Sequence, residues 1–169
     1  MIYRNANLYN IKIRSEKQKT YHIKPTLAMT FYNFYIFNRK GVCLFYKEWN
    51  RPLYTLQDDP DEDRKLMFGM LFSLKDLTAK MSPEVSTQGI HTVKTPNYTI
   101  HHYESLSGIS FVLNTDPSIP DMYDKLFHIY SKIFVDCVNK NILNYNYKIG
   151  DVIDCPIFSQ SVENYLQSL

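Results

Sequence analysis

The sequence predicts an α+β domain in which a mainly antiparallel β-sheet is covered by helices on both faces. Three observations support this fold class. Strand-like segments follow one another in hairpin-linked groups, two other segments have the apolar period of a helix, and the first strand is apolar on both sides. An antiparallel sheet commonly leaves one face in water, so a strand that is apolar on both sides requires two covering layers. A chain of 169 residues is about the right length for one such domain.

The first strong pattern is the stretch FYNFYIFNRKGVCLFYKEW, residues 31–49. Its two apolar runs flank the polar tetrapeptide 38–41, which ends in glycine and predicts a β-hairpin. Because side chains alternate along a strand, the first run is expected to divide between two faces. One face would carry Phe31, Tyr35 and Phe37, and the other Tyr32, Phe34 and Ile36. The Pro- and Asp-rich residues 51–63 that follow are expected to form a polar loop.

Residues 63–83 are predicted to form a helix that ends at Pro83. At about 100° per residue, one apolar stripe is expected to face the sheet. It comprises Leu66, Met67, Met70, Leu71, Leu74, Leu77 and Met81. Phe68 and Phe72 are expected on a second side, away from the centre of this stripe. A helix with two apolar sides usually has two neighbours.

The second half of the chain adds three strands and two helices. Strands are predicted at 90–94, 97–104 and 109–113, with a turn at 105–108 and a loop at 114–120. A helix is expected at about 120–140 and a shorter one at 156–169, separated by a loop at 141–154. The element order is therefore β-β-α-β-β-β-α-α. The strands near residues 31–37 and 109–113, which are apolar on both faces, are expected at the centre of the sheet.

Positive charge is concentrated at the N-terminus. Residues 1–28 contain six basic residues and one acidic residue, a net charge of +5, whereas the rest of the chain carries −3. We expect residues 1–28 to be a disordered basic arm or an upstream extension of the gene model, and residues 29–169 to be the domain. Binding of this arm to an acidic membrane surface would need more clustered charge. The acidic body gives no reason to expect a nucleic-acid partner, and neither a membrane span nor a signal-peptide core is apparent.

Motifs for catalysis or cofactor binding are not found. The sequence contains no phosphate-binding glycine loop, nucleophile elbow or zinc-protease motif, and we expect no cofactor. His101 and His102 are adjacent on a predicted strand, so they should face opposite sides and cannot chelate a metal together. Cys43, Cys137 and Cys155 form no CxxC pair and are expected to be reduced thiols. A thiol-dependent enzyme would require an accessible cysteine of low pKa beside a histidine, and Cys43 lies in an apolar strand where burial makes a thiol inert.

Four blocks of sequence together resemble one family, that of the smallest longin-like subunits of the TRAPP (transport protein particle) complex. They are NFYIFNRKGVCLFYKEWNR (33–51), KLMFGMLFSLKDLTAKMSP (65–83), YTIHHYESLSGISFVLNTD (98–116) and VNKN (138–141). The resemblance covers most of residues 29–169 and excludes the N-terminal arm, the Asp-rich loop and the segment after residue 141. It implies a longin, or SNARE-like, fold: a five-stranded antiparallel sheet with one helix on one face and two on the other.

The resemblance also implies a function without chemistry of its own. It suggests a structural subunit of a vesicle-tethering complex whose partners are other longin-like subunits and subunits of the Bet-three type. The assembled core would promote nucleotide exchange on an early-secretory Rab GTPase in transport from the endoplasmic reticulum to the Golgi. The chain would then be cytoplasmic and would contact the endoplasmic reticulum and cis-Golgi membranes only peripherally, through the complex. The alternatives with the same fold are a small subunit of a vesicle coat adaptor and the longin domain of a SNARE.

One site hypothesis concerns the flanking pair on the first predicted helix. Phe68 and Phe72 are spaced i, i+4 on a side otherwise shared with Lys65 and Asp76. We expect this pair to help form a subunit interface, where each buried ring would contribute roughly 1.5–3 kcal/mol. The alternative is that both rings are buried in the domain's own core or under the loop at 51–62.

Overall fold

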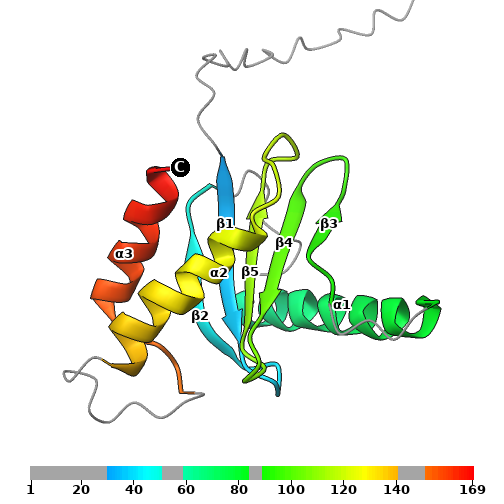
Figure 1. The fold of residues 1–169 in the computed structure, drawn as a ribbon, viewed down its shortest axis with the longest axis horizontal. Helices are drawn as coiled ribbons and strands as arrows, with labels where there is room; N and C mark the ends of the chain where they lie inside the picture. The colour runs from blue at the N-terminus through cyan, green and yellow to red at the C-terminus, as the bar shows by residue number, and fades with distance from the viewer. Residues whose placement is uncertain (1–29, 51–58, 84–88, 141–150) are drawn as a thin grey trace, which may run out of the picture.

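The computed structural model describes residues 30–50, 59–83, 89–140 and 151–169. In these ranges five strands form one antiparallel sheet with the order β2-β1-β5-β4-β3. The strands are β1 (Phe31–Phe37), β2 (Cys43–Glu48), β3 (Thr92–Lys94), β4 (Thr99–Glu104) and β5 (Ser110–Thr115). Helix α1 (Pro60–Met81) covers one face, and α2 (Tyr123–His128), its continuation η1 (Ile129–Asn139) and α3 (Pro156–Gln167) cover the other (Figure 1). The predicted fold class and the layer arrangement are confirmed.

The strands that are apolar on both faces occupy the interior of the sheet, as predicted. β5 is central, and β1 lies between β5 and the edge strand β2. The pairing of β1 with β5 shifts register between Phe31 and Asn33. Phe31 therefore packs with the core on the α2 and α3 side, whereas Tyr35 and Phe37 face α1. The prediction that all three share a face was wrong at Phe31, because a register shift interrupts the alternation.

Helix α1 begins earlier than the sequence pattern predicted. The side chain of Asp59 accepts a hydrogen bond from the backbone N–H of Asp61 at 2.9 Å and caps the helix. Pro60 follows at the first helical position, and acidic residues fill the first turn, where they interact favourably with the helix dipole. The Asp-rich run assigned to a loop is thus partly a helix start. Residues 51–58 lie outside the described ranges.

The larger core cluster is covered by two further helical segments, one formed by α2 with η1 and the other by α3. α2 runs directly into η1, whose turns are of the wider π type, and the pair covers part of the predicted helix 120–140. The core between these helices, α3 and the sheet is almost entirely apolar. Its largest fully buried members are Phe34, Phe111, Phe134 and Phe158, each at most 1% exposed. None of the helices in the described ranges is long and apolar enough to cross a bilayer.

The predictions for residues 1–28 and for the centre of the loop at 141–154 lie outside the described residues and stay predictions. Strands β3 and β4 each begin two residues later than predicted, at Thr92 and Thr99. β5 continues to Thr115, so part of the expected loop at 114–120 belongs to the sheet. This extension buries Asn114, which donates a hydrogen bond to Asn33 of β1 at 2.7 Å.

Candidate protein-interaction site

Phe68 attaches α1 to the hairpin formed by β1 and β2. Its ring centroid lies 5.6 Å from that of Phe37, and the side chain packs against the smaller core cluster. Gly41 of the hairpin turn has φ +80°, and a Cβ there would lie 2.6 Å from two atoms of the Phe68 ring. Glycine is therefore needed at this turn both for its left-handed backbone and for its lack of a side chain. Phe68 was expected on a side of α1 away from the centre of the sheet-facing stripe, and its packing against this cluster agrees with the alternative that the ring belongs to the domain's own core.

Phe72 lies one turn further along the same side of α1 and is 65% exposed. Its ring stacks on that of Phe68 with centroids 6.3 Å apart. The pair therefore forms a continuous apolar surface that begins in the core and ends in solvent. The structure brings the two predicted residues together but gives them different roles. Phe68 belongs largely to the domain's own packing, and Phe72 is available to a partner.

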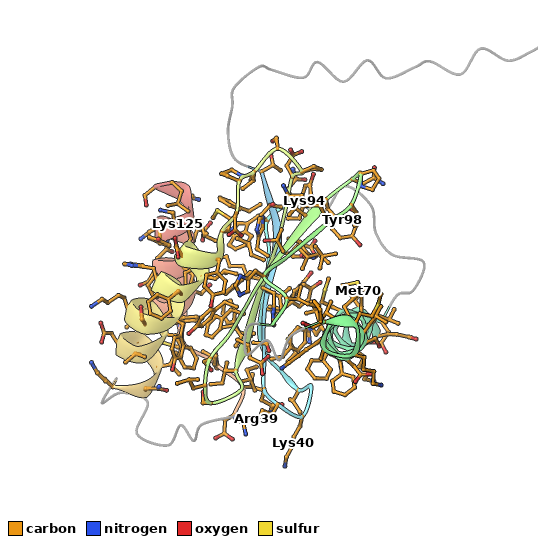
Figure 2. All side chains as sticks on the ribbon, turned by 45° about the vertical axis from the view of Figure 1, so that its right-hand side comes forward. Arg39, Lys40, Met70, Lys94, Tyr98 and Lys125 are labelled. Carbon is orange, nitrogen blue, oxygen red and sulfur yellow. The ribbon has the colours of Figure 1, made fainter. Side chains whose placement is uncertain are left out.

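A groove of about 520 Å³ lies between this side of α1 and the ends of the β1–β2 and β4–β5 turns. Phe68, Leu71, Phe72 and Ala79 supply its apolar wall. The lining residues on the sheet side include Arg39 from the β1–β2 turn, Glu104 from the end of β4 and Gly108 from the β4–β5 turn. Figure 2, which looks along α1, shows the helix beside the sheet with Arg39 and Lys40 at the lower end of the hairpin. The groove thus combines segments that are far apart in the sequence.

Among the described residues, the two acidic side chains that line the groove are already neutralised within the chain. Glu104 forms an ion pair with Lys75, and Asp76 forms one with Lys80 at 2.7 Å. Arg39 is different, because its guanidinium donates to the Leu106 carbonyl at 3.0 Å and forms no ion pair with the described carboxylates. Within the part of the chain that the structure describes, the groove therefore has one cation without a matching anion at its turn end.

α1 also has a second exposed apolar side that sequence reasoning assigned to the core. Leu66, Leu77 and Met81 are 60%, 51% and 73% exposed, whereas Leu71 is 6% exposed. The predicted stripe was therefore correct at Leu71 and wrong at these three residues. Figure 1 shows the reason for the C-terminal part: that end of α1 projects beyond β3, the edge of the sheet.

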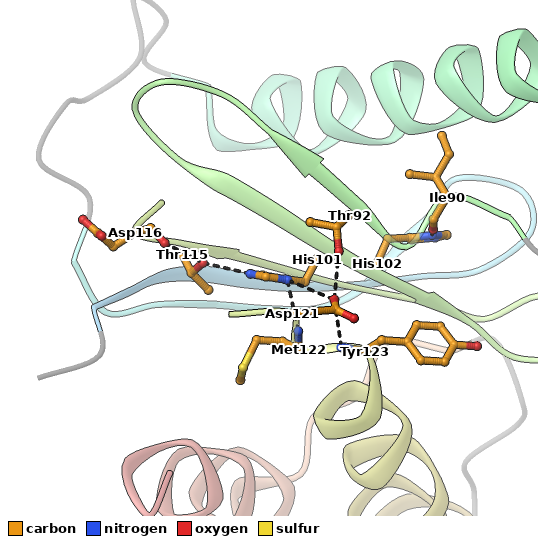
Figure 3. Close-up of polar contacts among 9 residues, drawn as sticks. All are labelled: Ile90, Thr92, His101, His102, Thr115, Asp116, Asp121, Met122 and Tyr123. Atoms are coloured by element: carbon orange, nitrogen blue, oxygen red, sulfur yellow. Dashed lines mark hydrogen bonds and ion pairs between the residues drawn. The ribbon is translucent and has the colours of Figure 1, made fainter. Parts of the chain in front are cut away.

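The two adjacent histidines face opposite layers, as predicted, and both are buried. The Met122 backbone N–H donates to Nδ1 of His101 at 3.3 Å, and Nε2 lies 3.0 Å from the Thr115 hydroxyl (Figure 3). This arrangement assigns the ring proton to Nε2. Burial lowers the pKa of His101 from its ordinary 6.5, although the Asp121 carboxylate, 3.8 Å from Nδ1, opposes that shift. His101 is thus a neutral link between the sheet and the start of α2.

His102 lies on the α1 side and lines the groove. Its Nδ1 is 2.7 Å from the Ile90 carbonyl, so that nitrogen carries the proton and donates. Burial lowers its pKa as well, partly offset by the Ile90 hydrogen bond. Both imidazoles therefore support the polypeptide framework in their neutral form, through hydrogen bonds to Thr115, Met122 and the Ile90 carbonyl.

The arrangement of the cysteines does not suggest an activated thiol. Burial raises the pKa of Cys43, with the positive charge of Arg64 acting in the opposite direction. Its thiol donates to the Phe45 carbonyl at 3.2 Å rather than to a histidine. Within the described ranges no group of three or more His, Cys, Asp or Glu side chains could hold a metal ion. The most distinctive surface in these ranges is the groove beside Phe72, which is suited to binding an apolar protein segment.

A sheet covered on both faces and an open groove beside an exposed aromatic ring define a small α+β domain suited to assembly with other proteins.

Residues 31–169 match the Sybindin-like family. The chain is 41% identical over 140 residues to "Trafficking protein particle complex subunit 1" of Dictyostelium discoideum, covering 82% of this chain and 95% of that protein. The protein of that name from Homo sapiens is 39% identical over 141 residues, 83% of this chain and 94% of the human protein. "Trafficking protein particle complex subunit BET5" of Saccharomyces cerevisiae is 36% identical over 121 residues, 69% of this chain and 76% of the yeast protein. The chain belongs to the Sybindin-like family.

Proposed function

We propose that this chain is a structural subunit of a trafficking protein particle (TRAPP) complex. The names of its relatives support this assignment, because the relatives' sequences match this chain over most of both lengths. The single structural observation that carries it is the exposure of Phe72 at 65% beside an open groove. A large aromatic ring at the mouth of an apolar groove is typical of a protein–protein contact.

The finer proposal is that the assembled core promotes nucleotide exchange on an early-secretory Rab GTPase. Exchange of this kind requires a surface that binds the nucleotide-free GTPase more tightly than the nucleotide-bound one. It requires no nucleophile, which is consistent with the neutral, framework roles of His101 and His102. The proposed partners are longin-like and Bet-three type subunits, and the proposed location is cytoplasmic, peripheral at endoplasmic reticulum and cis-Golgi membranes. Membrane contact would be indirect, through the complex.

The experiment that tests the assignment is co-purification with a tag at the C-terminus, followed by identification of the bound proteins by mass spectrometry. Recovery of other TRAPP subunits in stoichiometric amounts would support the proposal, and nucleotide release from candidate Rab GTPases could then be measured on the whole core. Recovery of a coat complex instead, or of no stable partner, would contradict it.

A substitution at Phe72 tests whether the partner binds at the groove. Replacing Phe72 with Ser should leave the fold intact, because the ring is mostly in water, and should weaken binding to a co-purified partner about tenfold, since burial of such a ring contributes more than about 1.4 kcal/mol. Affinity would be measured by calorimetry and fold stability by denaturant unfolding.

Two variants serve as controls for this test. Phe68→Ser should lower stability as well as binding, because that ring packs against Phe37 and Gly41. Phe127→Ser removes a ring that is 48% exposed on the opposite layer and should leave partner affinity unchanged. An unchanged affinity in Phe72→Ser, with the complex still formed, would show that the partner binds elsewhere.

A further inference from the structure

We infer that the groove beside α1 accepts a partner segment in which a large apolar side chain is followed or preceded by a carboxylate, and that this carboxylate pairs with Arg39. The inference rests on the proposed function and specifies the chemistry of the partner at that site. It depends on how charge is distributed around the groove rather than on the exposure of Phe72 alone.

Acidic side chains from α1 and from the end of β4 line the groove. Glu104 and Asp76 are both compensated by lysines of α1, so the described part of the groove wall offers no unpaired negative charge to a basic partner. A partner lysine or arginine placed here would have to compete with Lys75 and Lys80 for carboxylates that are already engaged. The charge pattern therefore disfavours a basic segment.

Arg39 contacts the β4–β5 turn at the edge of the groove. Its aliphatic stem lies over Gly108, where a Cβ would come within 2.2 Å of Cγ and 2.0 Å of Nε. The guanidinium is thereby held at the groove and uses one N–H on the Leu106 carbonyl. An arginine side chain has five N–H donors in a rigid plane, so several remain for a ligand. A pre-positioned guanidinium favours a carboxylate because the two groups can form two parallel hydrogen bonds.

Side chains of α1 form the apolar wall of the groove. Phe72 and Phe68 stack beside the groove, and Leu71 and Ala79 extend the apolar surface along α1. A volume of about 520 Å³ lies within the range of roughly 300–1,000 Å³ that is usual for ligand pockets. It can accept one or more large side chains from a partner. The complementary segment thus presents an apolar residue to Phe72 and an acidic residue to Arg39.

The test uses the assembled complex and a matched pair of charge-removing variants. Arg39→Met keeps the aliphatic stem over Gly108 but removes the charge. Lys40→Gln removes the neighbouring charge, which Figure 2 shows at the tip of the turn and which does not line the groove. The chain would be combined with purified TRAPP small subunits of the same organism. Affinity would be measured by calorimetry at low and high NaCl, and stability by denaturant unfolding.

We expect Arg39→Met to bind about tenfold more weakly at low salt and to show a smaller loss of affinity with added NaCl than the wild type, since a charge pair is screened by salt. Lys40→Gln should stay within about twofold of the wild type, because exposed charges distant from the contact contribute little. In addition, Arg39→Glu should lose binding, and one Asp→Lys or Glu→Lys change in the partner should restore it. This restoration would identify the partner carboxylate.

The outcomes separate this inference from the proposed function. A wild-type complex whose affinity and salt dependence are unchanged in Arg39→Met overturns the inference and leaves the subunit assignment in place. Weaker binding with an unchanged salt dependence also overturns it, because Arg39 would then act only through packing. Failure of the wild-type chain to bind any TRAPP small subunit overturns the proposed function itself.

Discussion

Gly108 of the β4–β5 turn has no room for a side chain. It has φ +80°, and Arg39 fills the space that a side chain would occupy. Gly108→Ala should therefore lower the free energy of unfolding by about 2–3 kcal/mol, from the left-handed backbone and from displacement of the Arg39 hydrogen bond to Leu106. Denaturant unfolding of the purified variant would measure this loss.

Gly69 provides the matched control, because it lies within α1 and an added Cβ would meet nothing within 4 Å. Gly69→Ala should raise the free energy of unfolding by about 0.5–1 kcal/mol, since alanine has the higher helix propensity. Equal changes in the free energy of unfolding for the two substitutions would show that Arg39 does not fill the space beside Gly108.

The buried histidines make the stability of the fold dependent on pH. Both have pKa values below the ordinary 6.5 in the folded chain, chiefly because burial penalises the charged form. Below pH 6.5 the unfolded chain takes up protons at these positions before the folded chain does. The free energy of unfolding should therefore fall as pH drops from 6.5 toward the folded-state pKa values, by at most about 1.4 kcal/mol per pH unit for each histidine.

Unfolding curves at several pH values between 7.5 and 5.5 would test this slope. The charged groups near the two rings are Asp121 and Lys94 for His101, and Glu104 and Lys75 for His102. A variant in which both histidines are replaced by Gln should show a smaller slope over the same range, whatever its absolute stability. A stability that rises as pH falls would contradict the assignment of neutral, buried rings.

The sequence predicted the opposite orientations of His101 and His102, because alternation along a strand depends only on the backbone. It did not predict their burial. The contacts that bury His101 come from Thr115 and Met122, which are 14 and 21 residues away in the chain. Such partners depend on which strands become neighbours, and no local pattern contains that information. The same reasoning applies to the Arg39–Gly108 contact, which joins two separate turns.

In helix α1, the helical period determined which residues share a side of the helix but not which of them are buried. The period placed Leu71 and Leu77 on one stripe, but Leu71 is 6% and Leu77 is 51% exposed. A helix of 22 residues is about 33 Å long, whereas five strands span about 19 Å across a sheet. A helix that crosses such a sheet must extend beyond it, so part of its apolar stripe is left without a partner inside the domain.

Leu71 and Leu77 therefore should respond differently to the same substitution. Leu71→Ala should lower the free energy of unfolding by about 2–4 kcal/mol, because it removes a buried side chain from the cluster beneath α1. Leu77→Ala should change it by no more than about 0.5 kcal/mol. Thermal or denaturant unfolding of the isolated variants would distinguish them. Similar losses of unfolding free energy at both positions would indicate that Leu71 and Leu77 both face the sheet.

At the scale of the whole molecule, the layered architecture was predictable because it follows from apolar residues on both faces of β1 and β5. The interaction site was predictable only in part. The i, i+4 spacing identified Phe68 and Phe72 as a pair, but tertiary packing decided that Phe68 lies against Gly41 and that Phe72 remains in water. The groove itself requires two turns that are distant in sequence, so it could not be read from any single segment.

The apolar surface of α1 leads to a prediction about the isolated chain. Phe72, Leu66, Leu77 and Met81 are each more than half exposed, and they lie on two sides of one helix. Exposed apolar surface of this kind is stabilised by association, so the chain without its partners should self-associate as its concentration rises. Sedimentation velocity over a concentration series would show a shift from monomer to larger species.

Replacing Phe72 and Met81 together with Ser should raise the monomer fraction, because it removes the two most exposed of these side chains from opposite sides of α1. Phe127→Ser, on the other layer of the domain, should not. Co-expression with a binding partner should suppress self-association of the wild type as effectively as the double substitution does, since the partner covers the same surface. A wild-type chain that stays monomeric at the highest concentration would mean that its exposed apolar residues are too dispersed to form a contact with a second copy, and that any partner must supply most of the specificity through charge and shape.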